Sequence, residues 1–199
     1  MSFKSSGIQH RANNWQVAAS AGAASQFIEL FARAEVVGTD FFDWRFAIGI
    51  DGTTVFTPKG IFSNNGAFAV LTKTGAETTV TVRKQNVSWF GNFTPNDFLV
   101  DTDSLGIGDL KIVFADAAVS AVGANIEIRL FGGFNGVVRV YDAVDTLLAS
   151  YTLAGVSAFS NDGSAIFLGI KSLIGPVIWR VDFTIDPVER FAINRVDFS

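Results

Sequence analysis

The 199-residue sequence predicts an all-β protein, a two-sheet antiparallel β-sandwich or jelly roll that has, in one alternative, a short helix near its N-terminus. The first observation behind this prediction is a hydrophobic period of two, which is typical of strands with one buried and one wetter face. It is clearest over 110–114, 126–131 and 179–185. The second observation is the frequent turn signals between such segments, and their spacing favours a sandwich over alternating strands and helices.

The N-terminal part of the predicted domain leaves two alternatives open. Over 23–37 apolar residues recur at spacings of three and four, with charged residues between them, which suits a short amphipathic helix. The other alternative is an edge strand. The apolar residues concerned are Phe27, Ile28, Leu30, Phe31 and Ala34.

Composition and length indicate one folded domain. Hydrophobic residues make up 49% of the chain and charged residues 17%, which is enough apolar material for a sizeable core. We expect a single β-sandwich domain over 23–199, preceded by an N-terminal extension over 1–22. The net charge of −4 arises without long runs of either sign, which argues against nucleic acid as a partner. No stretch reaches the ~18–20 uninterrupted apolar residues of a membrane helix, so we expect no membrane span in this chain.

Few residues are available for catalysis. The chain has no cysteine, and His10 is its one histidine, so a catalytic triad or a multi-histidine metal site would need the polar N-terminal stretch. We therefore expect no enzyme and no cofactor, apart from calcium as an alternative. Carboxylate hydrolysis stays open, because it needs only two acids across a cleft, and Glu77, Glu127 and Glu189 are available. We interpret Glu127 and Asp182 as outward residues of alternating strands.

Two loops contain candidate calcium ligands. Asp101 and Asp103 belong to an aspartate-rich segment, and Asn161 and Asp162 belong to a second loop. Hard oxygen ligands of this kind suit calcium when backbone carbonyls complete the shell. Asn-Asp-Gly is equally an ordinary turn, in which short polar side chains bond their own backbone.

The strongest indication of binding is an aromatic cluster over 88–96. A sugar ring can stack on an exposed aromatic face while neighbouring amides bond its hydroxyls, the usual mix of apolar wall and few polar groups. The rival interpretation is that the same rings fill the space between the sheets. The candidate ligand-binding residues are Trp89, Phe90, Asn92, Phe93 and Asn96.

Three blocks of sequence together resemble a group of exported bacterial β-sandwich proteins found in cyanobacteria and proteobacteria, many of which carry a PEP-CTERM sorting tail. The blocks run from Ser88 to Pro95, from Asn161 to Ile170 and from Phe191 to Asn194. With supporting matches at Asp43-Trp44, 122–126, 138–143 and 147–150, the resemblance covers about 43–199. The chain departs from the group because it shows neither a signal peptide nor a sorting tail.

The resemblance implies an extracellular or cell-surface protein linked to the envelope, biofilm or polysaccharide matrix, with no catalytic residues to carry over. Together with the aromatic cluster it predicts a non-catalytic polysaccharide- or surface-binding module. The alternative is a self-assembling structural subunit of a surface layer or filament, because strand edges and apolar patches are natural pairing surfaces. A carboxylate-dependent glycan hydrolase is the third hypothesis. The expected partners are polysaccharide or another envelope component, and further copies of the chain.

Overall fold

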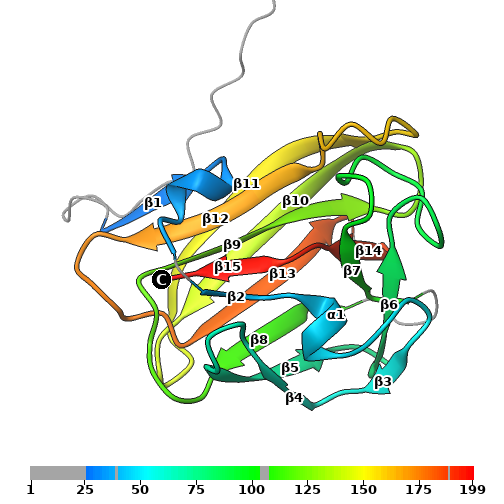
Figure 1. The fold of residues 1–199 in the computed structure, drawn as a ribbon. Coiled ribbons are helices and arrows are strands. Elements are labelled where there is room, and N and C mark those ends of the chain that lie inside the picture. The colour runs from blue at the N-terminus through cyan, green and yellow to red at the C-terminus, as the bar shows by residue number, and fades with distance from the viewer. Residues whose placement is uncertain (1–25, 39, 104–107, 188) are drawn as a thin grey trace, which may run out of the picture.

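Two antiparallel sheets face each other and enclose the core, so the predicted all-β sandwich is confirmed (Figure 1). The computed structural model describes residues 26–38, 40–103, 108–187 and 189–199. These residues form fifteen strands, one single-turn α-helix and one 3-10 turn. The predicted extension over 1–22, which includes His10, lies outside the described residues.

The first sheet, which we call sheet A, has nine strands in the described part of the chain. Along the main path they are β1 (Phe27–Leu30), β12 (Ile166–Ser172), β9 (Ala121–Ile128), β14 (Phe191–Ile193), β7 (Phe98–Asp101), β6 (Thr79–Lys84) and β3 (Thr54–Phe56). Beside this path β15 (Val196–Phe198) pairs with β9 and with β2 (Asp40–Phe42).

The second sheet, sheet B, has six strands within the same described ranges. In spatial order they are β11 (Leu147–Ser157), β10 (Gly132–Tyr141), β13 (Arg180–Asp186), β8 (Leu110–Phe114), β5 (Phe68–Lys73) and β4 (Lys59–Phe62). The three segments with the clearest period of two therefore contribute to β8, β9 and β13, as the sequence predicts.

The helix predicted near the N-terminus is wrong, and the edge-strand alternative holds. β1 pairs with β12, and only Arg33–Glu35 forms a 3-10 turn. Phe27 packs into the core between the sheets, whereas Leu30 packs on the outer face of sheet A. Residues three apart in a strand point to opposite faces, so a strand buried on both sides produces the same spacing as a helix.

The α-helix, α1 (Trp44–Ala47), forms one turn that positions a core tryptophan. It begins after Asp43, whose side chain accepts a hydrogen bond from the Arg45 backbone N–H at 2.9 Å. The Trp44 indole is fully buried and donates to the Asn194 backbone carbonyl at 2.8 Å. Within the described residues, no helix combines the length and apolar character required to cross a membrane.

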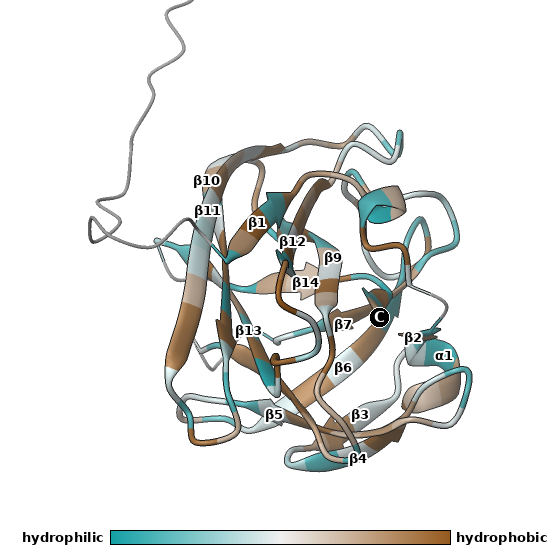
Figure 2. Cartoon of the chain, turned by 90° about the vertical axis from the view of Figure 1, so that its left-hand side faces the viewer, coloured by the Kyte–Doolittle hydropathy of each residue, from teal (hydrophilic) through white to brown (hydrophobic). Residues whose placement is uncertain are grey.

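The core lies between the sheets and is built by strand alternation. On β9 the even-numbered residues from Val122 to Ile128 face inward and join the main apolar cluster. Phe42, Phe114 and Phe198 pack ring against ring there, with centroids 4.9 to 6.2 Å apart. The side view in Figure 2 shows the strands of both sheets around this interior.

Sheet A is also covered on its outer face, contrary to the expectation of one wetter face for each strand. One small cluster contains Leu30, Val36, Ala121 and Phe167, and another contains Trp89, Phe93, Leu99, Ala165 and Ala192. Glycine makes room for the first cluster, because a Cβ added at Gly123 would lie 2.5 Å from the Phe167 ring. The outer face of sheet A is thus a second packing surface.

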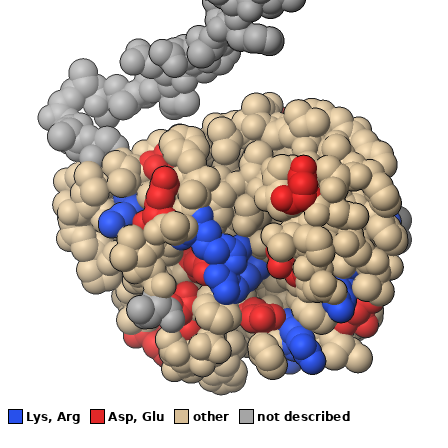
Figure 3. Space-filling model, turned by 45° about the horizontal axis from the view of Figure 1, so that its top comes forward, with Lys and Arg blue, Asp and Glu red and all other residues tan. Residues whose placement is uncertain are grey.

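A polar network lies on the outer face of sheet A. Arg33 Nη2 donates to the side-chain oxygens of Asn125 and Asn194, at 3.1 and 2.9 Å. The Nε of Arg33 lies 3.2 Å from an Asp197 carboxylate oxygen. Figure 3 shows basic and acidic side chains gathered side by side near the middle of its view, so each sign is locally neutralised.

Removing a core ring should cost far more stability than removing an exposed one. Phe183 is fully buried in β13, and we expect Phe183→Ala to lower the free energy of unfolding by about 3–5 kcal/mol through lost burial and a cavity. Phe56 on β3 is 80% exposed, and Phe56→Ala should change it by less than about 0.5 kcal/mol. Urea unfolding of both variants measures the difference, and equal losses would contradict the placement of the core.

Candidate functional site

Trp89 and Phe93 are buried, but they pack on the outer face of sheet A and not between the sheets, where the core interpretation placed them. Trp89 is fully buried and Phe93 is 1% exposed, and their rings meet edge to face with centroids 6.4 Å apart. The Arg129 guanidinium lies over the Trp89 ring, 5.0 Å from its centroid. Neither ring is available for a sugar to stack on.

Asn92 is likewise used within the protein. Its Oδ1 accepts from the Ala158 backbone N–H at 2.8 Å. Its Nδ2 donates to the Val156 carbonyl at 3.1 Å and to Ser164 Oγ at 2.9 Å. The Asn92 side chain therefore joins the loop over 85–97 to the loop that follows β11, and its hydrogen-bonding groups are not free for a ligand.

Glu127, on β9 of sheet A, contacts the same two loops. It points to the outer face of sheet A, as the alternation predicts, but it is only 1% exposed because the loop over 85–97 covers it. Its carboxylate accepts hydrogen bonds from the Asn92 backbone N–H at 2.8 and 3.0 Å and from Ser157 Oγ at 2.8 Å. Burial raises the pKa of Glu127, and the hydrogen bonds from Asn92 and Ser157 partly oppose that rise.

Gly91 makes the contact with Glu127 sterically feasible. A Cβ added at Gly91 would lie 2.3 Å from Glu127 Oε2, closer than non-bonded atoms approach. The absence of a side chain at this position therefore lets the loop settle onto the carboxylate.

Phe90 is the aromatic residue of the predicted set that reaches the surface. It is 40% exposed and stacks on Phe159 with centroids 5.6 Å apart and planes 23° apart. Phe131 meets Phe159 edge to face at 6.2 Å. Phe131 and Phe159 are 61% and 62% exposed. We call these three rings the aromatic platform.

Three different segments contribute to the aromatic platform, and the junction described above fixes two of them. Phe90 directly precedes the Gly91-Asn92 pair that rests on Glu127, and Phe159 follows Ala158, which bonds Asn92. Phe131 lies in the turn between β9 and β10. The platform is therefore held by buried hydrogen bonds at its base.

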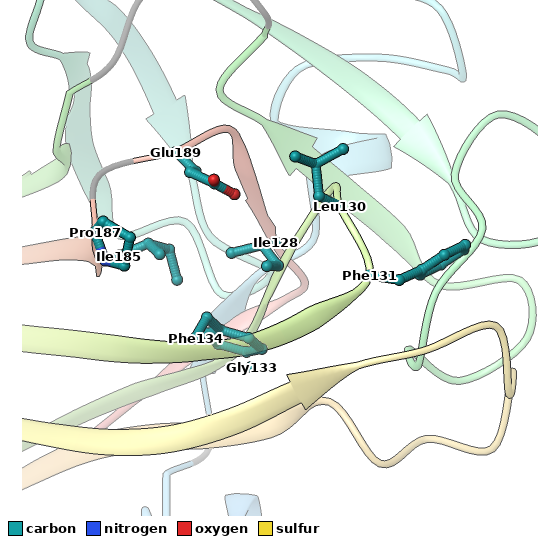
Figure 4. Close-up of a pocket in the computed structure, with 8 residues that line it drawn as sticks. All are labelled: Ile128, Leu130, Phe131, Gly133, Phe134, Ile185, Pro187 and Glu189. Carbon is teal, nitrogen blue, oxygen red and sulfur yellow. The ribbon is translucent and has the colours of Figure 1, made fainter.

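A small cavity adjoins the platform and shares Phe131 with it (Figure 4). Its volume is about 140 Å³, and its walls come from the β9–β10 turn and from the connection after β13. Figure 4 shows the Glu189 carboxylate on the side of the cavity opposite Phe134 and Gly133. The lining residues are Ile128, Leu130, Phe131, Gly133, Phe134, Ile185, Pro187 and Glu189.

The cavity offers little for acid–base catalysis. Glu189 is the one carboxylate among the described residues that line it. Glu127, the other nearby candidate of the hydrolase hypothesis, is buried with both oxygens engaged. Asp182 is also buried, on the outer face of sheet B, where it pairs with Arg180 and Lys111. A glycosidase needs two carboxyl groups that reach the same bond, and this arrangement supplies one.

The candidate calcium ligands have partners of other kinds. Asp101 is fully buried, and its oxygens accept from Arg83 Nε at 3.1 Å and Arg190 Nε at 2.8 Å. The Asp103 backbone N–H donates to Asp101 at 3.0 Å. Two guanidinium groups thus neutralise the charge that a cation would need.

The second candidate loop forms the ordinary turn that the sequence left open. Asp162 accepts from the Ser164 backbone N–H at 2.9 Å, and hydrogen bonds from Ser164 lower the pKa of Asp162. Asn161 has a positive φ of 51°, and its side-chain oxygen accepts from Gln85 Nε2. No group of three or more His, Asp or Glu residues placed to hold a metal occurs among the described residues.

Asn96, the last of the predicted ligand-binding residues, lies in a turn. It is exposed and has a positive φ of 72°, in the turn closed by the hydrogen bond from Asp97 N–H to the Thr94 carbonyl at 3.0 Å. Asparagine tolerates this left-handed conformation better than most residues, which gives Asn96 a local structural role.

Sequence reasoning missed Phe131 and Phe159. Phe131 lies in the β9–β10 turn directly before Gly132, and Phe159 lies in the loop after β11, where the strand alternation does not call for a large apolar side chain. An aromatic residue next to a turn is therefore the signal that would have found them. No sequence pattern shows that residues 90, 131 and 159 meet.

Solved structures similar to this chain include one bacterial protein and one bacteriophage protein. A DUF4465 family protein from Bacteroides caccae ATCC 43185 matches 86% of this chain and 100% of its own, with a TM-score of 0.44 and 10% sequence identity. The enzymatically active domain of tailspike protein 4 of bacteriophage CBA120 matches 66% of this chain and 19% of its own, with a TM-score of 0.32 and 15% identity. At these TM-scores neither similarity carries an argument about function. No protein-family model and no curated protein matches the sequence.

A methyl group at Gly91 should disturb the junction. We expect Gly91→Ala to lower the free energy of unfolding by about 1–3 kcal/mol, because its Cβ would displace the Glu127 carboxylate. Gly133→Ala is the matched control, because the nearest atom to its added Cβ is 4.0 Å away. Urea unfolding should show a change of less than about 0.5 kcal/mol for the control. Equal effects of the two substitutions would contradict the steric role of Gly91.

The raised pKa of Glu127 predicts a pH-dependent stability. The folded state takes up this proton at a higher pH than the unfolded chain, whose ordinary value is 4.5. The free energy of unfolding should therefore rise as the pH falls through the folded-state pKa toward 4.5, and Glu127→Gln should lack this component. Urea unfolding of both proteins from about pH 7 to about pH 4.5 measures it. A difference between them that does not change with pH would contradict the raised pKa.

Proposed function

We propose that this protein is a non-catalytic binding module that contacts polysaccharide through the aromatic platform and the adjoining cavity. The observation that supports this function best is the mutual contact of three exposed phenylalanines on a hydrogen-bonded base. Grouped exposed rings of this kind mark contact surfaces, because a lone domain gains nothing by leaving them in water.

The chemistry of this surface suits a sugar chain. The apolar faces of Phe90, Phe131 and Phe159 offer stacking surfaces for the C–H faces of pyranose rings. Glu189, at the wall of the cavity, is an acceptor for sugar hydroxyl groups. The cavity is small, so the surface suits contact along a chain better than enclosure of a whole ligand.

The setting that we propose is the cell envelope or extracellular matrix, and the partner is a bacterial exopolysaccharide. This part of the proposal rests on the resemblance to exported PEP-CTERM-type sandwich proteins. The absence of a second reachable carboxylate at the described part of the cavity makes a glycan hydrolase the less favoured alternative.

Binding should raise the thermal midpoint of the protein, because a ligand that binds only the folded state stabilises it. We expect one class in a panel of bacterial exopolysaccharides to raise the midpoint, with calcium and with chelator alike. Phe159 contacts both other rings, so Phe159→Ala should weaken the affinity about tenfold or more by titration calorimetry.

Phe56→Ala is the matched control, since Phe56 is even more exposed than Phe159, at 80% against 62%, but belongs to β3. Unchanged affinity of this variant would show that the platform, and not general hydrophobicity, binds the glycan. A panel without any midpoint shift would refute the binding module and favour the structural-subunit alternative. Release of reducing ends, lost in Glu189→Gln, would instead support the hydrolase.

A further inference from the structure

Strand β11 is the longest of the strands in the described part of the chain, and within that part it has one neighbour in its sheet. Its eleven residues, Leu147–Ser157, pair with β10 without interruption from Ala149 to Ser157, and β11 ends the order of sheet B. In an antiparallel strand every second residue turns its backbone N–H and C=O groups away from a given neighbour. Apart from its pairing with β10, the β11 backbone accepts one hydrogen bond from the described residues, from Asn92 Nδ2 to the Val156 carbonyl. We propose that this free edge pairs with β11 of a second copy of the chain.

The other sheet edges are protected in the usual ways, and β11 is not. β1, β2, β3 and β4 have three or four residues each, and charged residues lie in three of them. Short length and charge are the devices that prevent edge-to-edge pairing. The sequence of β11, LLASYTLAGVS, contains no charged residue and no proline over a length that could form several inter-strand hydrogen bonds.

The side chains of β11 indicate that the sandwich is incomplete along this edge. Ala149, Tyr151 and Leu153 face the core through their register with inward residues of β10, yet they are only partly buried. An added strand would cover these side chains in the way that β10 covers its other neighbours. In Figure 2, β10 and β11 run along one margin of the molecule.

A second copy of β11 is the partner that these observations favour. A sugar cannot satisfy a row of backbone donors and acceptors spaced for an extended chain, whereas a strand can. When β11 of one chain pairs antiparallel with β11 of another, a two-fold axis relates the two chains, which is the commonest symmetry of homo-oligomers. It places no like charges opposite each other, because the strand has none.

The dimer would join two six-stranded sheets into one continuous sheet. This interface is independent of the proposed glycan binding, but it affects how the aromatic platforms are displayed. Phe159 lies just beyond the C-terminal end of β11, so antiparallel pairing places the two platforms toward opposite ends of the shared edge. A strand of this length spans about 37 Å.

Sedimentation equilibrium of the full chain at micromolar concentration tests the interface. We expect a mass twice that of the 21.4-kDa chain. The double variant Thr152→Lys and Ala154→Lys, at two exposed outward positions of β11, should halve that mass while the circular dichroism spectrum stays that of the folded wild type. Val113→Lys is the matched control, because Val113 is exposed on the same sheet but lies on β8, three strands from the edge. A monomeric wild type, or a dimer that survives the double variant, would overturn the proposal.

Cross-linking tests which strand lies at the interface. The chain has no cysteine, so Ser150→Cys, Thr152→Cys and Ala154→Cys each introduce a single thiol on the outward side of β11. Because paired residues near a two-fold axis come within disulfide distance, at least one of these variants should form a covalent dimer on oxidation, and Val113→Cys should not. If none of the three links in a protein that sediments as a dimer, the interface lies elsewhere and the proposal fails.

Discussion

The contact between Glu127 and the backbone of Asn92 holds the candidate site together. A buried carboxylate is costly unless hydrogen bonds replace the water that it loses, and here the Asn92 N–H and the Ser157 hydroxyl do so. The same contact presses the loop over 85–97 onto sheet A and fixes the start of the loop after β11. Phe90 and Phe159 meet at the surface because their loops meet underneath it.

Burial of sheet A on both faces explains much of the composition. A sandwich strand usually has one wet face, but the outer face of sheet A carries two apolar clusters and a polar network between covering segments. Large rings such as Phe167 fit there only where glycine leaves room, as at Gly123 and Gly169. The many phenylalanines and glycines of the chain are thus partly complementary in space.

The sequence predicted the fold well because strand alternation is a local property. The two-sheet sandwich and the strands around 112, 126 and 182 follow from it. The helix at the N-terminus was wrong because a strand buried on both faces imitates helical spacing. In the candidate site, Phe90 was found from its own segment, whereas Phe131 and Phe159 were missed because only tertiary contacts bring them together. Trp89, one residue before Phe90, is buried with Phe93, and no local pattern shows which ring of such a cluster faces water.

Strand β11 links the two proposed properties in one element. Its last residue, Ser157, bonds Glu127, and the Asn92 loop lies against Val156 and Ala158, so the C-terminal end of the strand is already occupied. A partner strand can therefore extend only along the part before Val156. That limit separates the dimer interface from the aromatic platform, and it means that pairing of two chains would leave Phe90, Phe131 and Phe159 exposed. Two platforms on one assembly would bind a polymer with repeated units more tightly than either alone, because the second contact forms within an already bound complex.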